Sequence, residues 1–447
     1  MSDLLAIGAT GVRAYQTALT TVSDNIANAG TAGFSRRTTT LGEISAINAR
    51  ASASASGGSG VTVTGTRRAG DELRQAAVRS AGSDIGRTQS GITWLSEIEG
   101  ALNDNTLPAN LTAFFNAAKS VAADPTASAP RAAFIEAGTS VANSFNLTGK
   151  ALDAANASLD TTAQNAVTQL NGLLTTLGQV NNGLGAAQAN TSANAQLLDQ
   201  RDQLLEQVSA ITNATVTTDD RGRVTLRLGD ASGPVALTGD IPAYVSYARN
   251  GSGAVAFAVS RNGSVDSLTP TGGALAGVID GAQRIAAART EINQLASDFT
   301  SQINNFQAQG RDLNGNPGAA FFTVGATPTD ISVAITDPST VAAAAVGGGT
   351  RDNSNINTLE TLRSQSGFEN NLTTIISANA SALSARRQVA DAQNSIFDGA
   401  VAARDSVSGV NLDAEAVDLV RYQQAYQASG RVIQVAQDTF QTILNIR

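Results

Sequence analysis

The stretch "LTTVSDNIANAGTAGFSRR", residues 19–37, joins an apolar periodic segment to a run of small and amide residues and then to two arginines. Between residues 5 and 26, apolar residues recur every seven positions, a spacing that places them along one side of a helix. Asn28 and the glycines at 30 and 33 stop the helix, because these residues adopt left-handed backbone angles at little cost. We therefore predict an amphipathic helix of about seven turns. Its apolar stripe consists of Leu5, Val12, Leu19 and Ile26, with Tyr15 and Val22 on the second heptad line.

The last segment of the sequence repeats this pattern. Its stripe consists of Leu412, Leu419, Tyr426, Ile433 and Phe440, with Leu444 on the second line. Periodicity alone leaves two interpretations open: both helices pack in the core of an ordinary bundle, or they form a seam between subunits. Their position at opposite ends of the sequence favours a seam, in which the two helices pair with each other and then with other subunits.

Between these ends, long helical segments alternate with short strands. Helical patterns cover residues 71–121, with a break at 105–108, and then 131–187, 197–211, 273–308 and 356–406. Residues 213–270 alternate apolar and polar side chains around Asn-Gly turns, which predicts a small β domain. A second strand-rich patch is expected at 320–336. The predicted fold class is therefore mainly α with an inserted β domain (α+β).

We expect three discontinuous domains. Residues 1–35 plus 407–447 form an inner domain of terminal amphipathic helices with coiled-coil-like packing. Residues 36–212 plus 271–406 form an elongated helical-bundle middle domain, and residues 213–270 form the outer β domain. The pattern leaves open whether the strands at 320–336 belong to the β domain or to the helical body.

The composition excludes most kinds of chemistry. The 447 residues include no cysteine and no histidine, which excludes disulfides, thiolate nucleophiles, imidazole bases and the commonest zinc ligands. A net charge of −8 offers no basic stripe for nucleic acid. No apolar stretch approaches the roughly 20 residues that span a bilayer. We expect no enzyme activity, no cofactor, no metal, no nucleic-acid partner and no membrane insertion.

Three polar or glycine-rich motifs have structural interpretations. "DLNGNPG", residues 312–318, begins like a calcium loop but has Pro317 at the sixth position, so it predicts a turn. Asp199 and Asp202 share a helix face that we expect to be solvated, because nothing nearby in the sequence would desolvate them. "GGSGVTVTG", residues 57–65, is expected to be a flexible loop.

Five segments together resemble one known family. "SDNIANAGTAGFSRR", residues 23–37, looks like the signature after the first helix of flagellar rod, hook and hook-associated proteins, and "NLDAEAVDLVRYQQAYQASGRVIQVAQDTFQTILNIR", residues 411–447, resembles their C-terminal helix. "LLDQRDQLLEQVS", "GGALAGVIDGAQ" and "NNFQAQGRDLNGNPGAAFF" resemble interior segments of the hook-associated branch. The signature turn comprises Asn25, Asn28, Gly33, Phe34, Ser35 and Arg36.

This resemblance implies a structural role in the bacterial flagellum. It implies a homo-oligomeric ring or helical assembly at the hook–filament junction, with hook protein on the proximal side and a second junction protein on the distal side. It also implies a cytosolic export chaperone at the C-terminal helix, and type III export to the extracellular flagellum without a cleaved signal peptide. Arg36 and Arg37 then pair with acids of a neighbouring subunit or lie in a solvated loop.

Two alternative functions remain open at this point. The nearest is another axial protein, either hook protein or a filament-side junction protein. A surface adhesin carried by residues 213–270 is a more distant alternative.

Overall fold

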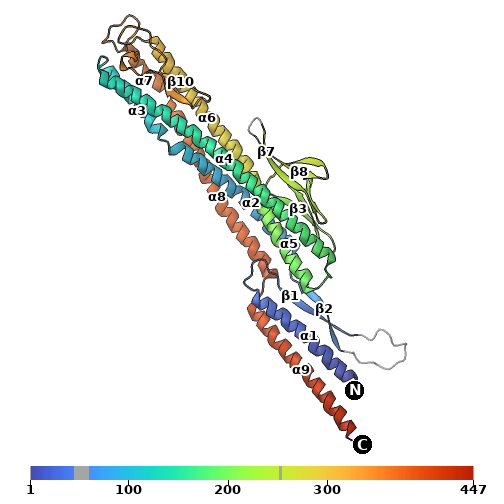
Figure 1. Cartoon of the computed structure of the whole chain (residues 1–447). Coiled ribbons are helices and arrows are strands. Elements are labelled where there is room, and N and C mark those ends of the chain that lie inside the picture. Colours follow the sequence, from blue (N-terminus) through green and yellow to red (C-terminus); the bar gives the residue numbers. More distant parts are fainter. Residues whose placement is uncertain (1, 45–59, 251–253, 446–447) are drawn as a thin grey trace.

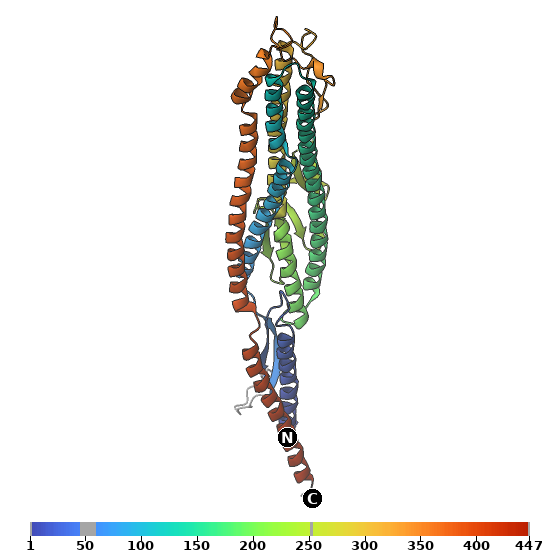
Figure 2. The same cartoon turned by 90° about the vertical axis from the view of Figure 1, so that its left-hand side faces the viewer.

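The structure, a computed structural model, describes residues 2–44, 60–250 and 254–445, without the side chains of Ser2 and Leu444. The molecule is an elongated rod (Figures 1 and 2). Helices α1 (Ser2–Ala27) and α9 (Leu412–Leu444) lie side by side at one end of the rod, where both termini are found. The rest of the chain forms a helical body that extends away from this terminal pair.

Long helices make up the body. They are α2 (Glu72–Asn103), α4 (Ser128–Ala186), α5 (Ser192–Ile211), α6 (Gly273–Gln309) and α8 (Phe368–Ser408). Helix α4 has 59 residues, or about 90 Å of helix, and runs along most of the body. Local chemistry sets where these helices begin: the Asp71 carboxylate accepts hydrogen bonds from the N–H groups of Leu73 and Arg74, and the Thr191 hydroxyl caps α5 in the same way.

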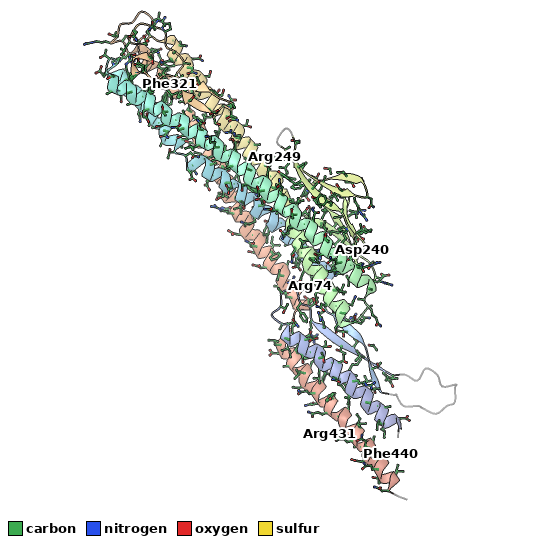
Figure 3. All side chains as sticks on the ribbon, viewed as in Figure 1. Arg74, Asp240, Arg249, Phe321, Arg431 and Phe440 are labelled. Carbon is green, nitrogen blue, oxygen red and sulfur yellow. The ribbon has the colours of Figure 1, made fainter. Side chains whose placement is uncertain are left out.

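The far end of the body is closed by shorter elements around an aromatic core. Helices α3 (Leu107–Ala123) and α7 (Ser354–Ser366), the 3-10 turn η1 (Pro338–Thr340) and the hairpin β10 (Phe322–Val324) to β11 (Ile331–Val333) gather there (Figure 1). Phe321, labelled in Figure 3, packs with its ring centroid 5.1 Å from that of Phe134 and 5.8 Å from that of Phe114. The strands within 320–336 thus pack on the helical body, far along the rod from the other sheets.

Two small antiparallel sheets lie against the side of α4. The first has the order β3 (Ala214–Thr218), β4 (Val224–Leu228), β5 (Val235–Thr238), β6 (Ile241–Pro242), and the second has the order β7 (Tyr244–Arg249), β8 (Val255–Arg261), β9 (Ser264–Leu268). Their buried residues, such as Leu226 and Phe257, belong to the same hydrophobic cluster as the helices. The sheets therefore share the core of the body.

Two asparagines of α4 join these sheets to the helix. Asn181 is fully buried; its amide nitrogen donates to the carbonyl oxygens of Val224 (2.7 Å) and Gly239 (2.6 Å), and its oxygen accepts from the N–H of Val224 (2.9 Å). Asn171 binds the N–H and carbonyl groups of Val245 in the same way, at 2.8 and 2.9 Å. Both amides satisfy strand backbone groups that would otherwise be buried without partners.

Three local expectations are settled by the structure. The segment at 57–65 was expected to be a flexible loop, which is wrong for its described part: β2 (Val61–Arg68) pairs with β1 (Arg37–Glu43) in a hairpin, while 57–59 lie outside the described residues. The helix expected at 356–406 is divided at Gly367, whose φ of +59° ends α7. The turn at 312–318 is confirmed, with the Asp312 carboxylate accepting from two backbone N–H groups at 2.8 Å.

The fold class, mainly α with small antiparallel sheets, is confirmed at this coarse level. The boundaries of the three domains stay predictions.

The asparagine contacts predict a large difference between two neighbouring positions. Asn181→Ala is expected to lower the free energy of unfolding by at least about 2 kcal/mol, because it leaves buried strand groups without partners. Asn182→Ala removes an exposed amide that lies 3.2 Å from Asp240 and is expected to change it by less than about 0.5 kcal/mol. Urea unfolding of the two variants measures both changes, and equal losses would contradict this role for Asn181.

Candidate assembly surface and joint

Helices α1 and α9 pack antiparallel through small residues. Gly8 faces Ile433, and a β-carbon added at this glycine would lie 2.6 Å from the Ile433 Cγ1 atom. Gly11 is equally close to the Ser429 hydroxyl. Further along the pair, Ala18 is fully buried in a small cluster with Val22 and Tyr422. The absence of bulk at these α1 positions allows the two helices to approach closely.

The structure divides the predicted apolar stripes into two groups. The side chains turned toward the α1–α9 contact are partly or fully buried: Val12, Tyr15, Leu19, Val22, Leu419 and Ile433. The other group is 36–55% exposed: Leu5, Ile26, Leu412, Tyr426 and Phe440. The Leu444 side chain lies outside the described residues. The first heptad line of each helix therefore runs through both groups: it contains side chains that are covered within the subunit and side chains that are open.

Further exposed apolar residues lie on other sides of α9, and sequence reasoning missed them. Val417 is 68% exposed, Val435 61% and Phe440 55%, and Figure 3 labels Phe440 near the end of α9. We use the name open row for the exposed apolar residues of the terminal pair: Leu4, Leu5, Ile26, Leu412, Val417, Val420, Tyr426, Val432, Val435, Phe440 and Ile443. Valines outside the strict heptad carried no separate signal, because the seven-residue count selects one line and ignores its neighbours.

The signature turn is held by contacts to α5. Gly33 has φ +75°, and a β-carbon there would meet the Gln203 side chain at 2.3 Å. The Gln203 amide donates to the carbonyl of Ala32 at 2.7 Å. Ser35 is buried, Asn28 bonds back to the Asp24 carbonyl, and the Phe34 ring lies under the Arg37 guanidinium, 4.8 Å from its centre. The turn therefore packs closely against α5 of the body.

Two members of the signature meet a residue from the other end of the sequence. The Asn25 amide donates to Glu415 at 2.9 Å, and the Arg36 guanidinium donates to the second oxygen of the same carboxylate at 2.6 Å. Arg36 also approaches Asp418 at 3.4 Å. Arg36 thus pairs with acids of its own chain, which differs from the expected neighbour contact or solvated loop. Sequence reasoning missed Glu415, because a pairing across 390 positions leaves no local signal.

Asp199 and Asp202 lie in a cluster of buried ion pairs, so the expected solvated face is wrong. Arg37 and Arg68 contact Asp199 at 3.0 and 2.6 Å, and Arg68 and Arg201 contact Asp202, both at 2.6 Å. The aspartate side chains are 9% and 7% exposed. The β1–β2 hairpin, which the sequence did not predict, brings Arg37 and Arg68 over this face of α5 and removes it from water.

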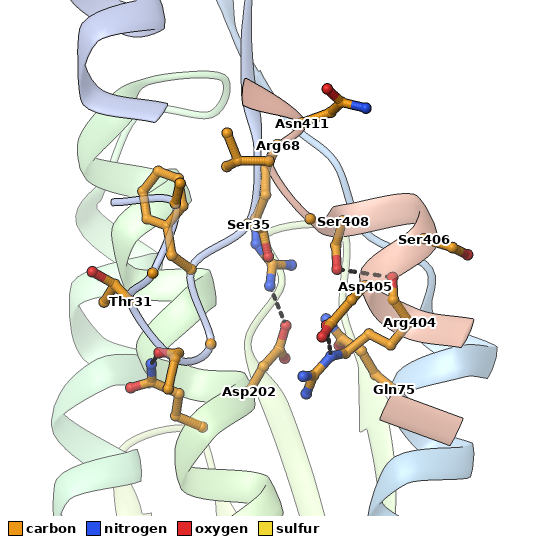
Figure 4. Close-up of a pocket in the computed structure, with 18 of the residues that line it drawn as sticks. Thr31, Ser35, Arg68, Gln75, Asp202, Arg404, Asp405, Ser406, Ser408 and Asn411 are labelled. Carbon is orange, nitrogen blue, oxygen red and sulfur yellow. Dashed lines mark hydrogen bonds and ion pairs between the residues drawn. The ribbon is translucent and has the colours of Figure 1, made fainter. Parts of the chain in front are cut away.

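A hollow of about 1330 Å³ lies between the signature turn, α5 and the link from α8 to α9 (Figure 4). Arg68 and Asp202 bond to each other on its wall, and Arg404 and Asp405 face it from α8. Burial raises the pKa of Glu206 in this hollow, and Arg404, at 2.8 Å, opposes part of the shift. The inner elements α1, β1, β2 and α9 connect to the body here by two short links in the described chain, at 69–71 and 409–411.

Two classes of site have no support in the described ranges. Their Asp and Glu residues form no group of three or more that is placed to hold a metal ion. In the same ranges, no helix is both long and apolar enough to cross a membrane.

Comparison with known proteins agrees with the terminal pair and the helical body. The family described as "Flagellar basal body rod FlgEFG protein C-terminal" matches residues 403–446, which include all of α9. This match defines the class, that of flagellar rod and hook-type proteins. The family described as "Flagellar hook-associated protein FlgK helical domain" matches residues 95–322, just over half of the chain. The chain belongs to this FlgK family, a family of structural proteins, and the resemblance noted in the sequence is confirmed.

Several individual relatives of the chain are named flagellar hook-associated protein 1. Flagellar hook-associated protein 1 of Salmonella typhimurium is 28% identical over 338 residues, which cover 73% of this chain and 60% of that protein. The namesakes of Escherichia coli and Bacillus subtilis are 24% and 22% identical over 100% and 97% of this chain. The structure of the flagellar hook junction protein FlgK from Burkholderia pseudomallei matches 56% of this chain and 46% of its own with a TM-score of 0.50 at 22% identity. That match shows likeness of fold.

The ion-pair cluster predicts unequal effects of removing two adjacent arginines. Arg68→Met is expected to lower the free energy of unfolding by roughly 3–5 kcal/mol, because it leaves two buried carboxylates short of a partner. Arg67→Met makes the same change at an exposed position and is expected to cost less than about 0.5 kcal/mol. Urea denaturation followed by circular dichroism measures both values. A loss for Arg68→Met as small as that for Arg67→Met would show that Arg37 and Arg201 are sufficient partners for the two aspartates.

Proposed function

We propose that this protein is a structural subunit of the bacterial flagellum that forms an adaptor ring at the hook–filament junction. Family membership supports the flagellar role, and the names of the relatives place those proteins at the hook. The observation that carries the proposal is the open row, because monomeric soluble proteins rarely leave so many large apolar side chains exposed on one helix pair. Neighbouring copies of the chain bury this row by packing their terminal pairs side by side.

The proposed assembly surface consists of the predicted seam residues and the rest of the open row. In a ring, the seam residues already buried in the subunit hold α1 to α9, and the open row contacts the next subunit. Hook protein lies on the proximal side of the ring and a second junction protein on its distal side. The long body then points outward from the terminal pair, carrying the sheets β3–β9 on its flank.

Export follows from the same proposal. The protein leaves the cell through the flagellar type III channel without a cleaved signal peptide and reaches the extracellular flagellum. The sequence contains no cysteine, so no disulfide opposes threading of the unfolded chain. A cytosolic export chaperone covers α9 before export, since the exposed valines and Phe440 need protection from non-specific association. Failure of the full chain to bind any such chaperone would count against this part of the proposal.

Addition of the purified protein to isolated hooks tests the adaptor role. The full chain is expected to cap the distal end of the hook in electron micrographs, and a chain truncated after Val410 is expected not to. Growth of independent filaments would indicate another axial protein, and failure to bind hooks would contradict the assignment.

A point variant separates loss of the surface from loss of the helix. Phe440→Asp is expected to abolish capping while leaving the circular dichroism spectrum unchanged, because the side chain is 55% exposed in the subunit. Gln434→Asp introduces the same charge at an exposed position outside the open row and is expected to cap hooks normally. Equal loss of capping in both variants would show that the open row is not the specific contact.

A further inference from the structure

Asn25 is the point at which the end of α1, the start of β1 and α9 are joined. Its side chain is fully buried. The amide oxygen accepts from the N–H of Arg37 at 2.9 Å, and the amide nitrogen donates to the Arg37 carbonyl at 2.8 Å and to Glu415 at 2.9 Å. Only an amide side chain combines these donor and acceptor roles at one position.

Glu415 fixes α9 at the same point. Its side chain is 1% exposed, and its two oxygens receive separate donors, the Asn25 amide and the Arg36 guanidinium. A buried carboxylate is costly unless it is paired and hydrogen-bonded. Rotation of α9 about its axis, or displacement along it, would break at least one of these contacts. The carboxylate is therefore satisfied in one position of α9 relative to the signature turn.

Arg36 connects this point to the body. Its N–H donates to the carbonyl of Ser408, the last residue of α8, at 2.7 Å. Its carbonyl accepts from the N–H of Ala69 at 2.8 Å, on the link from β2 to α2. The main chain of Arg36 is thus bound to one link, at Ala69, and to the last residue of α8, next to the other link, while its side chain binds α9.

We infer that Asn25, Arg36 and Glu415 are positioning residues that set the direction of the α1–α9 pair relative to the body within a single subunit. The inference rests on the proposed function, in which the terminal pair carries the assembly surface. Because the three residues belong to one chain, the open row is aimed before any neighbour is present. The signature turn then acts as an internal joint, and it is not itself a surface for a partner.

Spin-label distances test this joint directly. The sequence contains no cysteine, so Ser395→Cys in α8 and Gln427→Cys in α9 provide two unique labels at exposed positions. The purified monomer is expected to give one narrow distance distribution between them. Asn25→Asp is expected to broaden this distribution by about twofold or more, because it sets a carboxylate against Glu415 and removes the amide donor.

A compensating variant distinguishes positioning from general destabilisation. In the double variant Asn25→Asp with Glu415→Gln, the new amide at 415 donates to the new carboxylate at 25. The Arg37 carbonyl still lacks its Asn25 donor, so the distribution is expected to narrow part of the way back to that of the parent. If the two side chains only added stability independently, the double variant would be at least as disturbed as the single one. Asp438→Asn removes one negative charge at an exposed position of α9, as Glu415→Gln does at a buried one, and is the matched control for that substitution, expected to give the parent distribution.

The same labelled proteins, added to isolated hooks, separate this inference from the proposed function. Capping is expected to fall roughly tenfold with Asn25→Asp and to recover in part in the double variant. A broad parent distribution, or no change on Asn25→Asp, overturns the joint even if the parent caps hooks. A parent that shows a narrow distribution but does not cap hooks overturns the adaptor role and leaves the joint standing.

Discussion

The two ends of this chain have to meet, and the rest of the structure depends on that constraint. α1 and α9 pack on each other at the end of the rod, and their small contact residues bury little apolar surface. The short hydrophobic contact is supplemented by buried polar groups at the base of the pair, where Asn25, Arg36 and Glu415 meet. A helix pair held at its base by hydrogen bonds keeps much of its apolar side chain area available for other subunits.

Buried charge of the same kind supports the adjoining hairpin. Arg37 and Arg68 come from β1 and β2, and Asp199 and Asp202 come from α5, so the cluster joins an inner element to the body. Replacing such pairs by apolar residues often leaves stability unchanged, but removing one partner is costly. In this structure the pairs matter for orientation, because the arginine of each strand fixes the position of that strand on α5. Family membership and this geometry agree on a structural protein.

Sequence patterns predicted the long helices, the β segment and the amphipathic ends because each of these depends on local periodicity. They did not predict the β1–β2 hairpin, whose strands "RTTTLGE" and "VTVTGTRR" are short, rich in threonine and separated by a long Ser/Ala/Gly-rich stretch. The error at Asp199 and Asp202 followed from that omission, because the hairpin is what buries them. Likewise, a heptad line contains both Leu419 and Phe440 but does not show which of its members are covered within the subunit. That distinction depends on the register between helices about 400 residues apart.

The two links at 69–71 and 409–411 have a mechanical consequence. Both cross at the joint, where the main chain of Arg36 is hydrogen-bonded to Ala69 in the first link and to Ser408 just before the second. In the proposed ring, a torque applied to the terminal helices would therefore reach the body along two covalent paths in parallel, both tied near the main chain of Arg36. Two parallel connections resist twisting better than a single one, so the body is expected to turn together with the terminal helices.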